Sequence, residues 1–303
     1  MTDQRSERAR LGALLGIDRL KRASSPDFTL VSIEEKESFI LEVLNLDLNG
    51  EEAVPALFLK PRLPGPPGPV VLYNHAHGGN YRRGKDELLG GADFLQAGPY
   101  GPALIGAGFS VLCYDAWCFG DRRARTESAT FKHLLWRGEN LWGRMVWDGL
   151  RAVDYLSSRS DVDPSRIGTL GISMGGSLAW WLAALEPRIA ACVDLCAMTD
   201  YESLDRLGSL DRHGLYYYVP GLLKEFSTAR IAALSAPRWH LSLNGSLDEL
   251  TPASGLPIVD RGLREAYKES GYPERWRMET SPSGHFETSA MRAAALAFLK
   301  EHL

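Results

Sequence analysis

The chain has 303 residues, of which 45% are hydrophobic and 24% are charged, and its formal net charge is −4. This length allows one large domain with a substantial core, and this charge provides no basic field for nucleic acid. The sequence contains no run of about 18 apolar residues, so it predicts no membrane span. The charged residues 1–10 do not resemble a secretory signal. We therefore expect a cytoplasmic globular protein that binds neither nucleic acid nor a membrane.

The N-terminal part of the chain predicts one helix followed by strands. Apolar residues recur at helical spacing over residues 7–22. Residues 39–48 alternate apolar and polar side chains, and residues 53–59 form a second run of this kind, so both are expected strands. The Pro- and Gly-rich segment 61–69 predicts a turn rather than a domain linker.

From residue 70 onward, apolar strands alternate with helical segments. The expected strands are 70–74, 109–114, 167–172, 189–196, 239–243 and 276–279. The expected helices are 146–157, 176–185, 253–267 and 288–303. This order predicts a mainly parallel sheet with antiparallel N-terminal strands and helices on both faces. We expect a single α/β domain over residues 1–303, with residues 198–237 forming a small cap or lip over the carboxyl edge of the sheet.

The segment Gly171-Ile172-Ser173-Met174-Gly175 joins an expected strand to an expected helix. A serine between two glycines at such a turn is typical of a nucleophile elbow. Glycine has no Cβ and tolerates the crowding of this sharp turn, which leaves the serine hydroxyl exposed. Ser173 is therefore the candidate nucleophile, and the alternative is a tight turn with an incidental serine.

A serine hydroxyl is a weak nucleophile unless a histidine takes its proton and an acid orients that histidine. On a fold of this kind, the acid and then the histidine follow the serine along the chain. His285 lies in a turn just after the last strand, whereas His302 lies at a helix end beside the C-terminus, so we select His285. Asp248 follows the preceding strand in a glycine turn and is the candidate acid, with Asp200 as the alternative.

The negative oxygen of a tetrahedral intermediate needs N–H donors that are already in place. One candidate is the backbone N–H of Met174, directly after the serine. The other lies in the loop 75–79, where we favour the N–H of His77 over that of Gly78. His75 and His77 would also suit a metal ion, but no third ligand lies close in the sequence, so we predict neither metal nor cofactor.

Loop residues are candidates to line a substrate pocket: Gly78, Trp117, Phe119 and Tyr216. The alternative is that most of these aromatic side chains pack in the core or between the cap and the sheet. The four cysteines form no C-x-x-C pair and have no zinc-ligand spacing, which favours free thiols in a reducing cytoplasm.

Together, the elbow, the loop 75–79, residues 245–252 and Gly284-His285 resemble the α/β-hydrolase fold. More narrowly, the chain is similar to the dienelactone-hydrolase-like and acetyl xylan esterase-like branch over residues 70–290. The resemblance implies the same serine, acid and histidine as a catalytic triad, and the same two N–H groups as an oxyanion hole. Strict dienelactone hydrolases carry cysteine at the elbow, and dehalogenases and epoxide hydrolases carry aspartate, so the serine here disfavours those chemistries.

These residues predict a serine hydrolase that cleaves a small-molecule carboxylic ester through an acyl-enzyme, and the family implies a short acyl group. Homo-oligomerisation is left open by the sequence. One alternative is an amidase or peptidase with the same three side chains. The other is a non-catalytic binding member of the fold, against which the presence of all three side chains argues.

Overall fold

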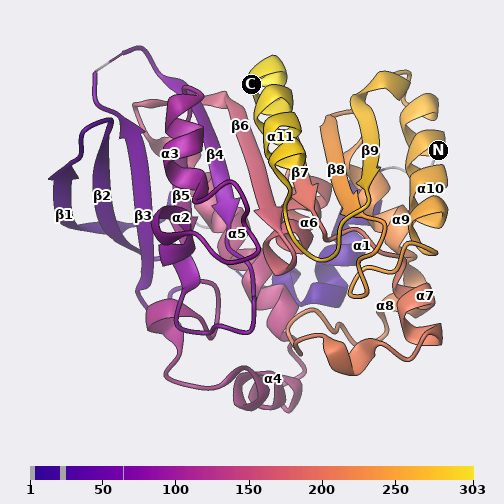
Figure 1. Ribbon diagram of the computed structural model, residues 1–303. Helices are drawn as coiled ribbons and strands as arrows, with labels where there is room; N and C mark the ends of the chain where they lie inside the picture. Colours follow the sequence, from indigo (N-terminus) through magenta and orange to yellow (C-terminus); the bar gives the residue numbers. More distant parts are fainter. Residues whose placement is uncertain (1–3, 21–24, 64) are drawn as a thin grey trace.

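The computed structural model describes residues 4–20, 25–63 and 65–303, and these residues form a nine-stranded sheet (Figure 1). Its order is β1-β2-β3-β5-β4-β6-β7-β8-β9. The strands are β1 (Phe28–Glu35), β2 (Phe39–Leu46), β3 (Val54–Pro61), β4 (Gly68–Asn74), β5 (Ser110–Tyr114), β6 (Val162–Ile172), β7 (Ile189–Leu195), β8 (Trp239–Gly245) and β9 (Trp276–Ser281). The pairs from β1 to β3, and β3 with β5, are antiparallel, whereas all pairs from β5 to β9 are parallel.

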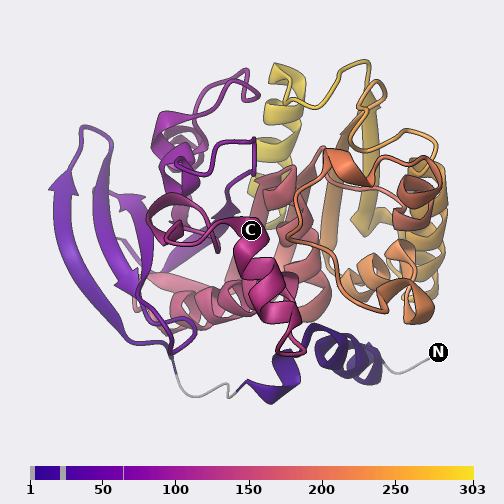
Figure 2. The same ribbon diagram turned by 90° about the horizontal axis from the view of Figure 1, so that it is seen from below.

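Helices cover both faces of this sheet, as the view along its lower edge shows (Figure 2). They are α1 (Gln4–Leu15), α2 (Glu87–Gly90), α3 (Tyr100–Gly106), α4 (Glu127–Leu135), α5 (Leu141–Ser158), α6 (Met174–Leu185), α7 (Tyr201–Arg206), α8 (Leu222–Glu225), α9 (Thr228–Ala232), α10 (Leu256–Glu269) and α11 (Ser289–His302). The apolar core on one face includes α1, α5, α6 and α10, and the core on the other face includes α3 and α11. The parallel strands are therefore buried on both sides, which explains their nearly continuous apolar sequences.

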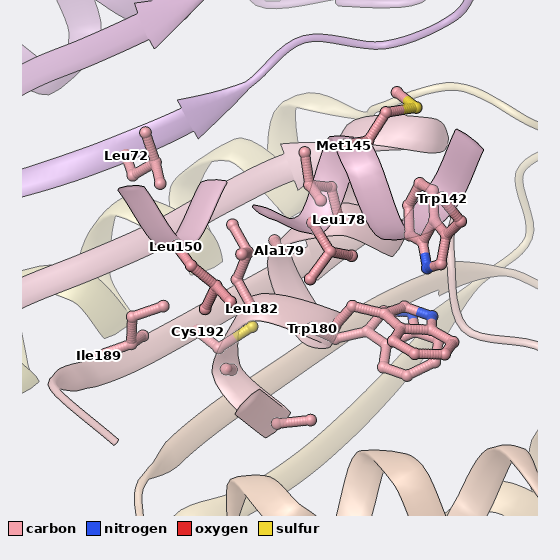
Figure 3. Packing of buried hydrophobic residues seen from close by; sticks show 14 of the residues in the cluster. Leu72, Trp142, Met145, Leu150, Leu178, Ala179, Trp180, Leu182, Ile189 and Cys192 are labelled. Atoms are coloured by element: carbon pink, nitrogen blue, oxygen red, sulfur yellow. The ribbon is translucent and has the colours of Figure 1, made fainter. Parts of the chain in front are cut away.

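The helix α6 lies at the centre of the larger core. Its Leu178 and Leu182 belong to the same buried apolar cluster as Leu150 of α5 and Ile189 at the start of β7 (Figure 3). A Cβ at Gly149 of α5 would lie only 2.6 Å from a methyl group of Leu182, so glycine allows the two helices to approach closely. This packing holds α6, and with it the turn that precedes α6, in a defined position against the sheet.

The predicted mixed α/β architecture is confirmed, but several boundaries differ from the expected ones. The expected helix 7–22 ends at Leu15 because Gly16 takes a left-handed φ of 72°, and residues 21 and 22 lie outside the described part of the chain. The strand β1 was not expected: it lies at the edge of the sheet and all eight of its residues are exposed, so it lacks the burial pattern of a core strand. The helix α4 was not expected either, and Thr126 caps its first turn.

Across residues 4–20, 25–63 and 65–303, no helix combines the length and the apolar character that a membrane crossing requires. All four cysteines are free and buried. Cys113 lies on β5 and Cys192 on β7, as expected of thiols in core strands.

Candidate active site

Ser173 occupies the turn between β6 and α6 with a φ of 58°, a conformation that is rare for a residue with a side chain. Its backbone N–H donates to the carbonyl of Leu195 at 2.9 Å, which ties the turn to β7. A Cβ on Gly175 would lie 1.9 Å from the carbonyl oxygen of Asn74, and a Cβ on Gly171 would lie 2.3 Å from the carbonyl carbon of Gly175. Neither glycine tolerates a side chain, so both are required for this turn.

The structure brings Ser173, His285 and Asp248 together at the carboxyl ends of β6, β9 and β8. The Oγ atom of Ser173 lies 2.8 Å from Nε2 of His285. The Nδ1 atom of the same ring lies 2.7 Å from Oδ2 of Asp248. A carboxylate only accepts hydrogen bonds, so Nδ1 carries the proton of the neutral ring and Nε2 is free to accept from the serine hydroxyl.

The carboxylate of Asp248 is buried and well provided with hydrogen bonds. Thr251 Oγ1 donates to it at 2.8 Å, and the backbone N–H of Leu250 donates at 2.8 Å. Burial alone would raise the pKa of Asp248, but the hydrogen bonds from His285, Thr251 and Leu250 outweigh it and hold the pKa below its ordinary value. The alternative acid, Asp200, instead caps α7 by accepting from the backbone N–H of Ser203 at 3.1 Å.

The two N–H groups named from the sequence lie in segments that leave them without partners. Met174 is the first residue of α6, where a backbone N–H has no intrahelical acceptor. Within the described residues, no acceptor meets the N–H of either Met174 or His77.

A network that sequence reasoning missed holds the loop around His77. The Nδ1 atom of His77 accepts from the N–H of Gly79 at 3.1 Å, so Nε2 carries the proton and lies 3.2 Å from Oε2 of Glu127. The hydroxyl of Tyr81 also donates to Glu127. Glu127 begins α4, about 50 residues further along the chain, and no local sequence pattern relates it to this loop.

The two histidines proposed as an alternative metal pair make separate contacts. Nε2 of His75 accepts from the N–H of Ala116 at 3.0 Å, whereas the ring of His77 contacts Glu127. Among the described residues, the group close enough to hold a metal ion is Cys192, Asp194 and His240. There Asp194 already accepts from His240 and from the hydroxyl of Ser242, both at 2.8 Å, in the core between β7 and β8.

A cavity of about 30 Å³ adjoins Ser173 and His285. We refer to it as the site cavity. Of the four residues named as candidate substrate-lining residues, Tyr216 lines it, whereas Gly78, Trp117 and Phe119 are not among the residues that do. Phe119 is fully buried and packs against the ring of His77, and Trp117 lies beneath the guanidinium group of Arg122.

Most of the side chains that sequence reasoning missed come from the segment 198–237. Besides Tyr216, this segment contributes Thr199, Tyr201, His213 and Tyr217 to the site cavity. The segment includes α7 to α9, and α7 and α8 lie with α4 below the carboxyl edge of the sheet (Figure 1). Tyr201 and Tyr217 also line a second cavity of about 570 Å³, whose other walls are mainly apolar side chains of α4, α7 and α8.

A family model described as acetyl xylan esterase (AXE1) matches residues 38–213, which is more than half of the chain. The chain belongs to the acetyl xylan esterase family. The predicted resemblance and the α/β-hydrolase fold class are thereby confirmed, and the protein is a carboxylic ester hydrolase. The match includes Ser173 and ends before Asp248 and His285.

The chain is also similar to a curated relative and to solved structures. The chain is 51% identical over 271 residues to a Bacillus subtilis (strain 168) protein known provisionally as hydrolase YtaP, covering 89% of this chain and 91% of that protein. Acetyl xylan esterase 1 from Thermoanaerobacterium sp. JW/SL YS485 superposes with a TM-score of 0.63 at 18% identity, over 99% of this chain and 93% of that one. A glucuronoyl esterase from Solibacter usitatus superposes with a TM-score of 0.67 at 15% identity, over 95% and 90%. At these two identities the likeness shows the fold alone.

Proposed function

We propose that this esterase cleaves short-chain carboxylic esters with Ser173 as nucleophile, His285 as general base and Asp248 as the acid that orients the histidine. The observation that carries this proposal is the continuous hydrogen-bonded chain from Ser173 to Asp248 through the two nitrogens of His285, at 2.8 and 2.7 Å. These distances are those of the serine–histidine–acid arrangement that activates a hydroxyl for acyl transfer.

In the first half of the reaction, Nε2 of His285 takes the hydroxyl proton while Oγ of Ser173 attacks the ester carbonyl carbon. The tetrahedral intermediate collapses, the bond to the alcohol oxygen breaks, and His285 returns the proton to that oxygen. Water then attacks the acyl-enzyme and gives a proton to the same nitrogen. When the bond to Oγ breaks, the acid leaves and the serine regains its proton.

We assign the backbone N–H groups of His77 and Met174 to the oxyanion that forms in both halves of the reaction. Neither N–H has an acceptor within the described residues, and donors already in place avoid reorganisation when the charge develops. The contacts of the His77 ring with Glu127 and Tyr81 restrain the loop that carries one of these donors.

The size of the site cavity supports a small acyl group. The space beside Ser173 and His285 is narrow, with a cavity volume of about 30 Å³. Because the segment 198–237 supplies five of the lining side chains, we propose that it acts as the cap that sets this size. A series of p-nitrophenyl esters tests the point: kcat/KM is expected to fall at least about tenfold from acetate to octanoate, and an equal or higher value for octanoate would contradict a short-acyl preference.

The replacement Ser173→Ala tests the nucleophile. It is expected to lower kcat for p-nitrophenyl acetate by a factor on the order of 10³ or more, because no other hydroxyl can form the acyl-enzyme. The variant should also lose labelling by a fluorophosphonate while its circular dichroism is unchanged. Ser270→Ala, at the far end of α10, is the matched control and should keep both properties. Residual activity of Ser173→Ala within tenfold of wild type would remove this serine from the mechanism.

The amidase alternative is tested by pairing p-nitrophenyl acetate with p-nitroacetanilide, which offer the same acyl group with an ester or an amide bond. We expect efficient hydrolysis of the ester alone. An anilide rate close to the ester rate would favour an amidase or peptidase.

We also propose a cytoplasmic location, which the four free and buried thiols support because such thiols persist in a reducing compartment. Fractionation of the source cells with an antibody to this protein would test it. Recovery of the protein in the extracellular medium would contradict the proposal.

A further inference from the structure

Three buried polar atoms of residues that line the site cavity have no hydrogen-bond partner within the described residues: Oγ1 of Thr199, Nε2 of His213 and the hydroxyl oxygen of Tyr217. Tyr217 also lines the larger apolar cavity, so Thr199 and His213 are the two of these residues that line the site cavity alone. The side chain of Thr199 belongs to a residue that is only 4% exposed. Buried polar side-chain atoms are usually paired, and an unpaired one costs free energy. Two such atoms beside one small cavity, next to the nucleophile, indicate a bound group that pairs with them.

The protonation of His213 defines what that group must offer. Burial lowers the pKa of His213, so its ring is neutral at neutral pH. Depending on the tautomer of the neutral ring, Nε2 either donates or accepts a hydrogen bond. The bound group must therefore be able to take the complementary role toward Nε2.

A hydroxyl can pair with both atoms, because it donates and accepts, as the hydroxyl of Thr199 also does. A carboxylate would be repelled by the charge of Asp248, which acts on the same histidine. An apolar group leaves both atoms unpaired. The cavity of about 30 Å³ has room for such a small polar group beside the reacting bond.

We propose that Thr199 and His213 form a subsite for a hydroxyl group that the substrate carries close to its scissile ester bond. The proposal rests on the ester hydrolysis assigned to Ser173 and names a specificity determinant for it. The hydroxyl belongs either to the acyl part or to the alcohol part of the ester. A site built to bond a hydroxyl discriminates strongly against an analogue that lacks it, since its buried polar groups are then left unpaired.

Two pairs of nearly isosteric esters test the subsite on the wild-type enzyme. Ethyl glycolate and ethyl propionate differ by a hydroxyl in the acyl part, whereas 2-hydroxyethyl acetate and propyl acetate differ by a hydroxyl in the alcohol part. Within each pair, kcat/KM for the hydroxylated ester is divided by kcat/KM for its partner. This ratio is then divided by the same ratio for hydrolysis by hydroxide, which corrects for the different intrinsic reactivity of the two esters. We expect a preference of about tenfold for the hydroxylated ester in one pair, which identifies the side of the bond that the subsite serves. No such preference in either pair overturns the proposal.

The variants Thr199→Val and His213→Phe each remove one partner with little change in size. Each variant is expected to lose nearly all of the preference for the hydroxylated ester that remains after correction for the hydroxide-catalysed rates. His133→Phe, on the surface of α4, should leave this preference unchanged. Preference retained in a folded Thr199→Val and a folded His213→Phe would assign the selectivity to other groups and overturn the proposal. If either variant fails to fold, the other variant and the wild-type ratios still decide.

The outcomes also separate this inference from the proposed function. Hydrolysis of all four esters without preference leaves the esterase mechanism in place and rejects the subsite. If none of the four is hydrolysed, or if Ser173→Ala remains active, the mechanism itself is wrong and the subsite falls with it.

Discussion

Asp248 illustrates how a single side chain orients the site. Its carboxylate accepts from Thr251 and Leu250 as well as from His285, so it is held from several directions. This arrangement keeps Asp248 ionised at neutral pH and places the ring proton of His285 on Nδ1. In the proposed mechanism, the ring is then ready to accept a proton from Ser173 without rotating or changing tautomer.

The replacement Asp248→Asn tests this role. An asparagine amide can donate to Nδ1, which would move the ring proton to Nε2 and prevent that atom from accepting from Ser173. We expect kcat for p-nitrophenyl acetate to fall by about 10⁴ while the fold is retained. The matched control is Asp200→Asn, because asparagine still caps α7, and it should keep activity within about twofold. A loss of less than tenfold in Asp248→Asn would place the orienting acid elsewhere.

Among the secondary-structure elements, α7 and α8 with their connections do most to shape the site. Two of their tyrosines, Tyr201 and Tyr217, contribute to both the site cavity of about 30 Å³ and the apolar cavity of about 570 Å³. Their rings lie 5.6 Å apart, centre to centre. Both tyrosines therefore border a small space beside Ser173 and a much larger apolar one.

Removing one of these rings should change the selectivity for acyl length. In Tyr217→Ala the two cavities join, so a longer acyl chain can enter the apolar one. We expect kcat/KM for p-nitrophenyl octanoate, relative to acetate, to rise about tenfold over the wild-type ratio. Tyr272→Ala, which removes an exposed ring between α10 and β9, is the control. An unchanged ratio in Tyr217→Ala would show that acyl chains do not reach the larger cavity. Because both rates come from the same sample, partial unfolding does not affect the ratio.

The stability of the whole molecule depends on a buried carboxyl group that contacts the loop 75–79. Glu87 is 1% exposed, and it accepts from the hydroxyl of Tyr73 at 2.7 Å and from the N–H of Ala76 at 3.1 Å. Burial raises the pKa of Glu87 to about 7, although both hydrogen bonds oppose this rise. The folded state therefore favours the protonated carboxyl, whereas the unfolded chain loses that proton near pH 4.3.

This difference predicts that Glu87 destabilises the fold as the pH rises. The protonated carboxyl of Glu87 stabilises the folded state fully below about pH 4.3, and this stabilisation is lost as the pH rises to about 7. In that window the folded state binds more protons than the unfolded state. A shift of this size corresponds to about 4 kcal/mol. In urea unfolding at pH 5 and pH 8, Glu87→Gln should lose less stability between the two pH values than wild type. Glu265→Gln, on the exposed face of α10, should behave as wild type, and an equal loss in Glu87→Gln would contradict the prediction.

Much of the fold follows from local patterns. Apolar runs predicted eight of the nine strands in the described residues, because a parallel strand covered on both faces must be apolar along its length. The edge strand β1 was missed because all eight of its residues are exposed, and α4 because its short sequence carries no strong helical pattern. Gly16 shows the limit of periodicity, since its left-handed backbone ends α1 within an apparently helical run.

The sequence by itself determined the turn around Ser173 and the order of the residues that meet there. Glycines at 171 and 175 are a local steric requirement, and Asp248 and His285 follow strands whose carboxyl ends must share one edge of a parallel sheet. Only the tertiary structure decided which side chains surround the serine. Thr199, His213 and Tyr217 come from a segment without a regular pattern, and the contact between His77 and Glu127 joins loop and helix about 50 residues apart. Such contacts depend on how the chain folds back over the sheet, and no local sequence pattern carries that information.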